Sequence, residues 1–367
     1  MLTPHHFLKP ANYSLTSMHN NISFTDAIQQ ATLQGMESDP TIFVMGLGVS
    51  YANGADGSTK GLKDKFPDRI LDSPVSEAAV TGAGVGAAIS GLRPIIHHGR
   101  VEFALFAVDQ IVTQAAKWNY MFGGGNAVPI IFRIAVGRQW GNGPQHTQAL
   151  YSLFGSVPGL KVVIPSSPAS AKGLLAAALK DRNPIVYMEP RWLYGTRQNV
   201  AVDNYTQDLG RAVTVREGSD ITVVTYGDGL VEALRAERFL RERQISVEII
   251  DLVSLQPIDH EAVLKSVTKT GRLITFDTTN SSFCVGSEII AKCCQRGLNV
   301  LKTAPISIAC PDVPCPTSTV LSAEFYPTKI DLIRQVHVAL RLPSVPEEKL
   351  SFEYLHISPK FDFSKNE

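Results

Sequence analysis

Short apolar runs alternate with longer amphipathic runs along most of the chain. In the first half, runs of strand length lie at Thr41–Gly46, Arg93–His97, Val128–Ile134, Leu160–Ile164 and Pro184–Met188. Helical patterns separate them, at Glu77–Gly91, Val101–Met121 and Ala169–Asp181. Strands that alternate with helices pair in parallel, and strands this apolar are buried on both faces. The pattern predicts an α/β fold.

The alternation lapses once and then resumes, which predicts two domains. The second set has strands at Ile221–Tyr226, Ser246–Leu252 and Arg272–Phe276, and helices at Leu230–Arg243, Val285–Arg296 and Lys329–Leu340. A chain of 367 residues has room for two domains. We expect two doubly wound domains at 21–194 and 213–343, joined by a linker at 195–212. A flexible extension (1–20) and a C-terminal tail (344–367) should lie outside the core.

The composition excludes several classes of partner. Lys plus Arg and Asp plus Glu both number 34, so the net charge gives no reason to expect binding to nucleic acid or to a membrane. No apolar run approaches the ~20 residues that span a bilayer, and Met1–His19 does not read as a signal peptide. The five cysteines form no CxxC pair, which favours free thiols in a reducing, cytoplasmic compartment.

Glu77 is the first candidate for chemistry. It follows Pro74 and Ser76 at the predicted start of a helix, and Ser76 is a suitable N-cap. On spacing alone, the carboxylate of Glu77 would only complement the helix dipole.

Two glycine-containing segments partly match the sequence motifs of phosphate-binding sites. Gly82, Gly84 and Ala87 match the GxGxxA dinucleotide fingerprint, but a Pro-containing turn precedes them where a strand is needed. These small residues favour close helix packing instead. Gly227-Asp228-Gly229 resembles the GDG start of a diphosphate motif, yet no Asn lies between residues 229 and 279. We interpret it as a turn that ends a strand.

Two polar segments follow predicted strands. His97, His98 and Arg100 stand where open α/β sheets place ligands, although adjacent histidines on an extended chain point in opposite directions. The loop Gly137–Gln148 (GRQWGNGPQHTQ) carries His146, which can move protons near neutral pH.

Taken together, the segments resemble one family. DSPVSEAAVTGAGVGAAISGLRPI, FALFAVDQIVTQAAKWNYMFGG, GPQHTQ, PGLKVVIP, DRNPIVYMEP, VEIIDLVSLQPID and PDVPCPTS stand in the order seen in β subunits of thiamine-diphosphate-dependent 2-oxo acid dehydrogenases. The resemblance covers roughly residues 21–342. It implies a pyrimidine-binding domain followed by a transketolase-type C-terminal domain. It also implies an α subunit that carries the GDG-type motif and holds the diphosphate and Mg²⁺, usually in an α2β2 assembly.

The resemblance assigns roles to four residues. Glu77 matches the glutamate that hydrogen-bonds a ring nitrogen of the aminopyrimidine and promotes its imino tautomer, which generates the reactive ylid. Val75 and Phe103 match residues that line the same ring. His146 matches a histidine near the thiazolium, expected to steer a proton or to guide the acyl group to a lipoyl arm.

Some members of the family also hold a structural potassium ion. The matching positions are Val128, Ile130, Ile131, Ala178, Asp181 and Asn183. A turn without an ion is the alternative interpretation.

Departures from the family pattern lie around the substrate. Leu47 replaces an acid, the His97–Arg100 group replaces a segment that often holds Glu or Gln, and Asp277–Asn280 replaces an HEA-type stretch. The leading hypothesis is a β subunit that, with its α partner, decarboxylates a 2-oxo acid and passes the acyl group to a lipoyl acyltransferase. A split transketolase-like or acyloin-forming enzyme without a lipoyl partner, and a non-catalytic regulatory subunit, are the alternatives.

Overall fold

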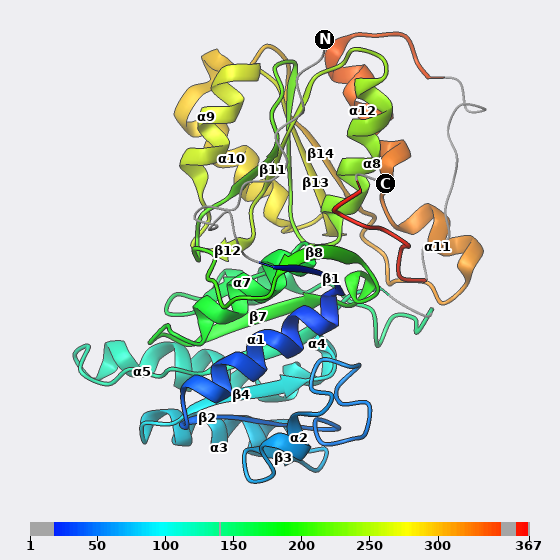
Figure 1. Cartoon of the computed structure of the whole chain (residues 1–367). Coiled ribbons are helices and arrows are strands. Elements are labelled where there is room, and N and C mark those ends of the chain that lie inside the picture. Colours follow the sequence, from blue (N-terminus) through cyan, green and yellow to red (C-terminus); the bar gives the residue numbers. More distant parts are fainter. Residues whose placement is uncertain (1–17, 139–140, 346–356, 366–367) are drawn as a thin grey trace.

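The structure, a computed structural model, describes residues 18–138, 141–345 and 357–365 (Figure 1). Its first domain is built on a seven-stranded sheet of order β12-β6-β7-β5-β4-β2-β3. The strands are β2 (Ile42–Gly46), β3 (Ile70–Asp72), β4 (Arg93–His98), β5 (Ile131–Val136), β6 (Lys161–Val163), β7 (Ile185–Pro190) and β12 (Ser254–Gln256). All neighbours pair in parallel except β12 and β6. The predicted α/β class is confirmed.

Helices cover both faces of this sheet. Helices α1 (Phe24–Ser38) and α7 (Pro168–Ala178) pack on each other on one face, and α3 (Glu77–Ile89) packs against β4 on the other. The neighbours Ile95 and Ile96 of β4 are both fully buried, but they belong to different hydrophobic clusters. Adjacent residues of a strand point to opposite faces, so a strand inside this sheet must be apolar throughout.

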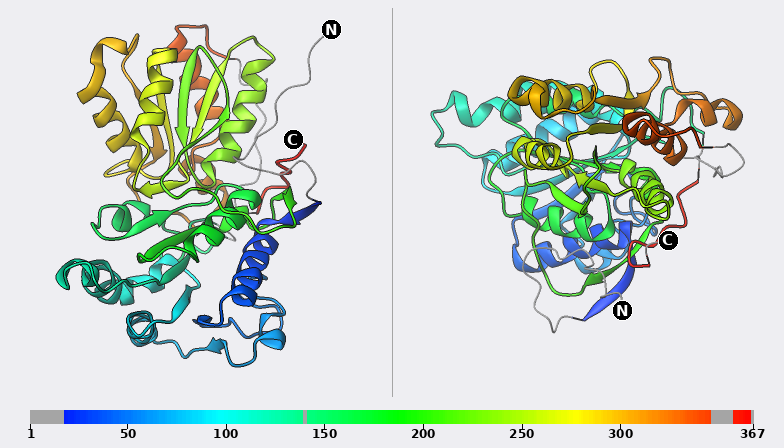
Figure 2. Two further views of the ribbon diagram at one scale, coloured as in Figure 1. Left: turned by 60° about the vertical axis from the view of Figure 1, so that its left-hand side comes forward. Right: turned by 90° about the horizontal axis from the view of Figure 1, so that it is seen from above.

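The second domain contains a five-stranded sheet of order β14-β13-β10-β11-β9. Its strands are β9 (Val213–Arg216), β10 (Ile221–Thr225), β11 (Val247–Asp251), β13 (Leu273–Asn280) and β14 (Ile306–Cys310). Figure 1 shows α9 (His260–Thr270) and α10 (Val285–Gly297) on one side of the sheet, and α8 (Gly229–Arg241) and α12 (Lys329–Leu340) on the other. Figure 2 shows this domain stacked on the first.

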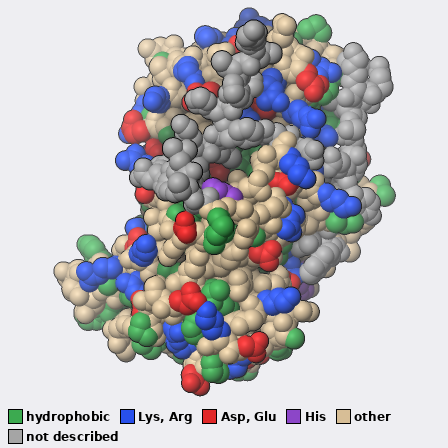
Figure 3. Space-filling view, in the orientation of Figure 1, with side chains coloured by type: hydrophobic (Ala, Val, Ile, Leu, Met, Phe, Trp, Pro, Cys, Tyr) green, Lys and Arg blue, Asp and Glu red, His purple; other side chains and the backbone are tan. Residues whose placement is uncertain are grey.

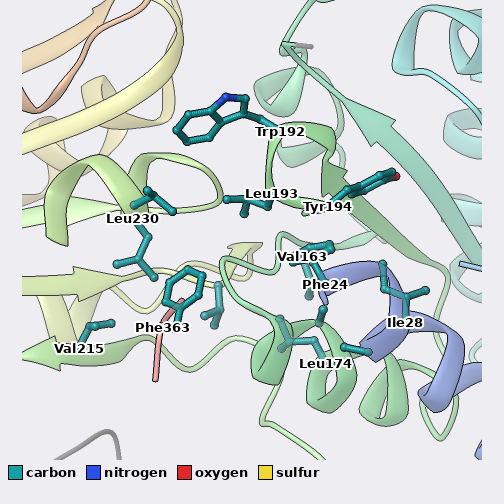
Figure 4. Close-up of a cluster of buried hydrophobic side chains, with 14 of the residues drawn as sticks. Phe24, Ile28, Val163, Leu174, Trp192, Leu193, Tyr194, Val215, Leu230 and Phe363 are labelled. Carbon is teal, nitrogen blue, oxygen red and sulfur yellow. The ribbon is translucent and has the colours of Figure 1, made fainter. Parts of the chain in front are cut away.

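Long-range pairings correct three of the expected boundaries. The linker holds a strand, β8 (Arg197–Ala201), which pairs with β1 (His19–Ser23). Strand β12 follows β11 of the second domain but extends the sheet of the first. The expectation that the whole tail lies outside the core was wrong, because Phe361 and Phe363 are buried in the core. Figure 4 shows Phe363 among its neighbours. Residues 1–17 of the expected extension lie outside the described residues.

The helix predicted at Val101–Met121 consists of four short pieces. These are α4 (Val101–Ala104), a 3₁₀ turn (Leu105–Ala107), a π-helix (Asp109–Ala115) and α5 (Ala116–Met121). π-helical turns are rare and concentrate at functional sites. The remaining helices are α2 (Leu62–Lys65), α6 (Tyr151–Gly155) and α11 (Thr319–Phe325), with two more 3₁₀ turns at Arg191–Leu193 and Leu298–Val300.

The surface agrees with the balanced charge of the sequence. Positive and negative side chains are interspersed over the face shown in Figure 3. Within the described ranges, no helix is long and apolar enough to cross a membrane. All five cysteines are free thiols, and of these only Cys294 is not buried.

Candidate active site at the carboxyl ends of β4 and β5

The carboxyl ends of β2, β4 and β5 lie side by side and place the candidate residues together. Gly46, the last residue of β2, pairs with His97 of β4. A Cβ atom at Gly46 would lie 2.5 Å from the main-chain oxygen of His97, so only glycine allows this approach. His97 and His98 end β4, and the loop that carries His146 follows β5.

Phe103 and His146 are in direct contact. Their rings meet edge to face, with centroids 5.7 Å apart and an interplanar angle of 85°. Phe103 lies on α4, directly after β4, and His146 lies in the loop after β5. The fold thus brings together two residues that the resemblance placed near one cofactor.

Two charged side chains at the start of α4 hold the backbone beside His146. Arg100 donates from Nη1 to the main-chain oxygen of His146 at 2.6 Å. Oε1 of Glu102 accepts from the main-chain nitrogen of Gln148 at 2.6 Å. Arg100 and Glu102 are both buried, so these charge-assisted bonds form in a site of low dielectric.

Burial shifts the pKa values of Glu102 and Arg100 in the directions that favour their uncharged forms. Desolvation raises the pKa of the Glu102 carboxyl, and hydrogen bonds from the backbone partly oppose that rise. Desolvation lowers the pKa of Arg100, and the nearby charge of Arg191 adds to the effect. The sequence pattern indicated Arg100 but not Glu102. The partner of Glu102 is a main-chain nitrogen of a distant segment, and no sequence motif predicts such a contact.

Glu77 is the first residue of α3, and its carboxylate has no hydrogen bond or ion pair within the described part of the chain. It is partly buried. Thr81 lies one turn later on the same face of the helix. Its Oγ1 is 3.2 Å from Nε2 of His98, which ties this face to the end of β4. The start of α3 therefore lies over the same edge of the sheet as Phe103 and His146.

His97 and His98 are buried and held neutral. Desolvation lowers the pKa of His98 to about 4. Desolvation also puts the pKa of His97 well below its usual value, and the positive charges of Arg133 and Arg191 add to this effect. Nδ1 of His97 has no partner among the described residues. A substrate role for His97, His98 and Arg100 stays a prediction, and the guanidinium of Arg100 already binds the His146 backbone.

Apolar side chains in the loop after β2, just before α3 and just after α4 are exposed. Val75 is 73% exposed, and Phe106, just after α4, is also 73% exposed. Leu47 and Tyr51, in the loop after β2, are exposed as well. Such a group of apolar residues beside a site is typical of a surface that a partner covers.

Two cations contact the segment that holds three of the six positions matched to a potassium site, Ala178, Asp181 and Asn183. Asp181 accepts from Lys161 Nζ and from Asn183. Arg93 donates to the main-chain oxygens of Leu179 and Asp181. The oxygens of Ala178 and Ile130 accept main-chain hydrogen bonds. The potassium ion stays a prediction. These residues do not suit a potassium ion while the ammonium of Lys161 binds the carboxylate of Asp181.

The structure explains both glycine motifs. At Gly84, a Cβ atom would lie 2.6 Å from Cδ1 of Ile96, so the small residue lets α3 approach β4 closely. Gly227 has φ +57° and stands between β10 and α8, as expected of a turn that ends a strand. The carboxylate of Asp228 is used within the chain, since Oδ1 accepts from Thr278 Oγ1 at 2.8 Å.

Two domain families match the chain. The transketolase pyrimidine-binding domain matches residues 20–197, and the transketolase C-terminal domain matches residues 210–332. A solved structure described as "Split gene transketolase, inactive beta4 tetramer" has a similar fold, with a TM-score of 0.72 at 21% identity, covering 88% of this chain and 99% of that chain.

Relatives of higher identity span nearly the whole chain. The β subunit of acetoin:2,6-dichlorophenolindophenol oxidoreductase from Cupriavidus necator is 38% identical, over 85% of this chain and 95% of its own. The pyruvate dehydrogenase E1 component subunit beta-1 of Arabidopsis thaliana is 39% identical, over 84% and 86%. The corresponding subunit of Saccharomyces cerevisiae is 35% identical, over 92% and 95%. The chain thus belongs to the family of β subunits of thiamine-diphosphate-dependent 2-oxo acid dehydrogenases.

Proposed function

We propose that this chain supplies the aminopyrimidine half of a thiamine-diphosphate site that an α subunit completes with the diphosphate and Mg²⁺. The observation that supports it most is that Glu77, without a hydrogen bond or ion pair within the described residues, starts α3 at the sheet edge that also carries the Phe103–His146 pair. The exposed side chains of Val75 and Phe106 offer the apolar surface that such a partner would cover. An α2β2 assembly is the proposed stoichiometry.

The residues present fit the aminopyrimidine ring. Glu77 offers an acceptor without a competing partner in the described chain, and Phe103 offers an aromatic face. When bound, thiamine diphosphate supplies a carbon nucleophile that the protein itself lacks. Glu77 is the residue that shares a proton with the ring nitrogen.

His146 is proposed to handle protons at the substrate, and α4 fixes its position. The edge of Phe103 limits how its ring can turn, and Arg100 holds its main-chain oxygen. A general acid or base must lie within hydrogen-bond reach of the proton that it moves. The bonds from α4 supply that alignment before the substrate arrives.

The proposed reaction is the decarboxylation of a 2-oxo acid, with transfer of the acyl group to a lipoyl carrier. The pyruvate dehydrogenase relatives support a small 2-oxo acid. The acetoin relatives, which have the same level of identity, support acyloin cleavage as the second candidate. The five free thiols support a reducing compartment such as the cytoplasm.

The function is tested by co-purifying the chain with its α subunit. Reduction of a dye acceptor is measured with pyruvate, with branched 2-oxo acids and with acetoin, and acylation of a lipoyl domain is measured separately. Turnover of a 2-oxo acid with lipoyl acylation supports the proposal. Turnover without lipoyl acylation favours a ketol-transferring or acyloin-forming enzyme. An inactive complex that still binds cofactor would indicate a regulatory subunit.

A further inference from the structure

A cavity of about 580 Å³ is lined by residues of both domains. Strands of both sheets end at the cavity. From the first domain, Val136 is the last residue of β5 and Pro190 is the last residue of β7. From the second domain, Asn280 ends β13, Cys310 ends β14, and Asp228 follows β10. Glu77, Phe103 and His146 do not line it. Parallel sheets bind ligands at the carboxyl ends of their strands, and here two sheets point their carboxyl ends at one space.

Among the described residues that line this cavity, Arg138 is the one cationic side chain. Arg138 is only 2% exposed, and its guanidinium contacts two aromatic rings. Its Cζ atom is 3.8 Å from the ring centroid of Trp192 and 4.9 Å from that of Tyr326. Trp192 and Tyr326 also line the cavity. An aromatic ring against the face of a guanidinium leaves the N–H groups at its edge for further partners.

That edge has no hydrogen-bond partner among the described residues. Nε of Arg138 lies 3.2 Å from Oδ2 of Asp228, an ion pair without hydrogen-bond geometry. Nη1 and Nη2 also lack partners. A buried charged group that keeps unsatisfied donors is strongly unfavourable, so an acceptor must fill this place when the site is in use.

The charges of the walls limit what can bind. Asp228 and Asp312 both line the cavity, and Asp312 accepts from the hydroxyls of Ser281 and Ser282. Two carboxylates would repel a polyanion. The guanidinium edge matches the planar oxygens of a carboxylate or the oxygens of a phosphate group. The volume has room for a molecule of several carbon atoms.

We propose that this cavity binds a small molecule with one oxyanionic group, a carboxylate or a phosphate ester, through the guanidinium edge of Arg138. The site is separate from the proposed cofactor site. It is connected to the loop that carries His146, because Thr147 and Gln148 line the cavity and Glu102 holds the nitrogen of Gln148. An occupant is therefore placed to influence the histidine loop from its other side.

The test is calorimetric titration of the full-length chain with glycolate and with inorganic phosphate, for wild type, Arg138→Met, Arg138→Lys and the surface control Arg243→Met. We expect one of the two probes to bind wild type and the control equally. Arg138→Met should weaken binding by about tenfold or more, the usual loss for a charged hydrogen-bond pair. Arg138→Lys keeps the charge without the planar fork and should bind with intermediate affinity.

The outcomes separate the alternatives. Binding of glycolate alone identifies a carboxylate ligand, and binding of phosphate alone identifies a phosphate ester. Failure of both probes to bind wild type, or equal binding by wild type and Arg138→Met, overturns the proposal. If Arg138→Met does not fold, Arg138→Lys decides, and unchanged affinity in that variant overturns it. None of these results depends on enzyme activity. Failure of this proposal would therefore say nothing against the proposed function.

Discussion

Arg100 holds His146 by its backbone: the Nη1 atom of the arginine donates to the main-chain oxygen of the histidine at 2.6 Å. Glu102, two residues later, accepts from the nitrogen of Gln148 at the same distance. The opposite charges of α4 thus bind the chain on both sides of Thr147. The His146 ring can meet Phe103 only if this segment keeps its path.

Removing either bond should impair catalysis more than cofactor binding. We expect Arg100→Met and Glu102→Met to lower kcat by about tenfold in the complex with the α subunit, the loss expected of one charge-assisted hydrogen bond. The affinity for thiamine diphosphate should stay near wild type, because Glu77 is untouched. His146→Ala should show the same separation of kcat from cofactor affinity. Steady-state kinetics and calorimetry check this, with the surface variant Arg243→Met as the control, and a defect confined to cofactor affinity would contradict it.

Much of the first domain follows from local pattern, and what the sequence misses is long-range. The predicted strand Arg93–His97 and the predicted helix start at Glu77 agree with β4 and α3, because apolar runs and Pro74 signal them locally. The pairing of β8 with β1, and of β12 with β6, joins segments far apart in the chain. No short-range signal encodes such pairings.

The candidate site was predictable only in part, for the same reason. His146 and Phe103 were found through motifs, and the structure places them in contact. Glu102 acts through a main-chain atom of another segment, and Arg138 through the ends of strands from both domains. Contacts of this kind appear only after the tertiary fold is known.

Glu77 should be essential for turnover and dispensable for folding. We expect Glu77→Ala to reduce kcat by roughly 100-fold or more, the scale of one proton-transfer group. Its carboxylate has no partner within the described chain, so the melting temperature should change little. Glu288→Ala, at an exposed first turn of α10, is the matched control. Near-normal turnover of Glu77→Ala would remove Glu77 from the mechanism.

The stability of the protein should fall in mild acid because His98 is buried neutral. Its pKa is about 4 in the folded chain and 6.5 for the ordinary side chain. Between these two pH values only the unfolded chain takes up the proton. The contribution of neutral His98 to the free energy of unfolding is therefore complete above pH 6.5 and is lost as the pH falls toward 4. It amounts to about 3 kcal/mol. His98→Gln should flatten the dependence of the urea midpoint on pH in this window, and an equally steep profile would show that His98 is not responsible.

Because of Lys161, potassium should not stabilise the chain more than sodium does. Its ammonium already binds Asp181, where the family pattern would place the ion. The melting temperature should therefore be equal in KCl and NaCl at the same ionic strength. Lys161→Met should be less stable, because it leaves a partly buried carboxylate without its cation. Specific stabilisation of wild type by K⁺ over Na⁺ would show that the ion displaces Lys161.

This chain is proposed to hold half of a cofactor site. The most direct test is calorimetric titration of thiamine diphosphate with Mg²⁺ into the purified chain, and then into the chain mixed with its α subunit. We predict binding only in the mixture, and weaker binding when Glu77→Ala replaces the wild-type chain. Tight binding to the isolated chain would contradict the account, because it would require a diphosphate site within this chain.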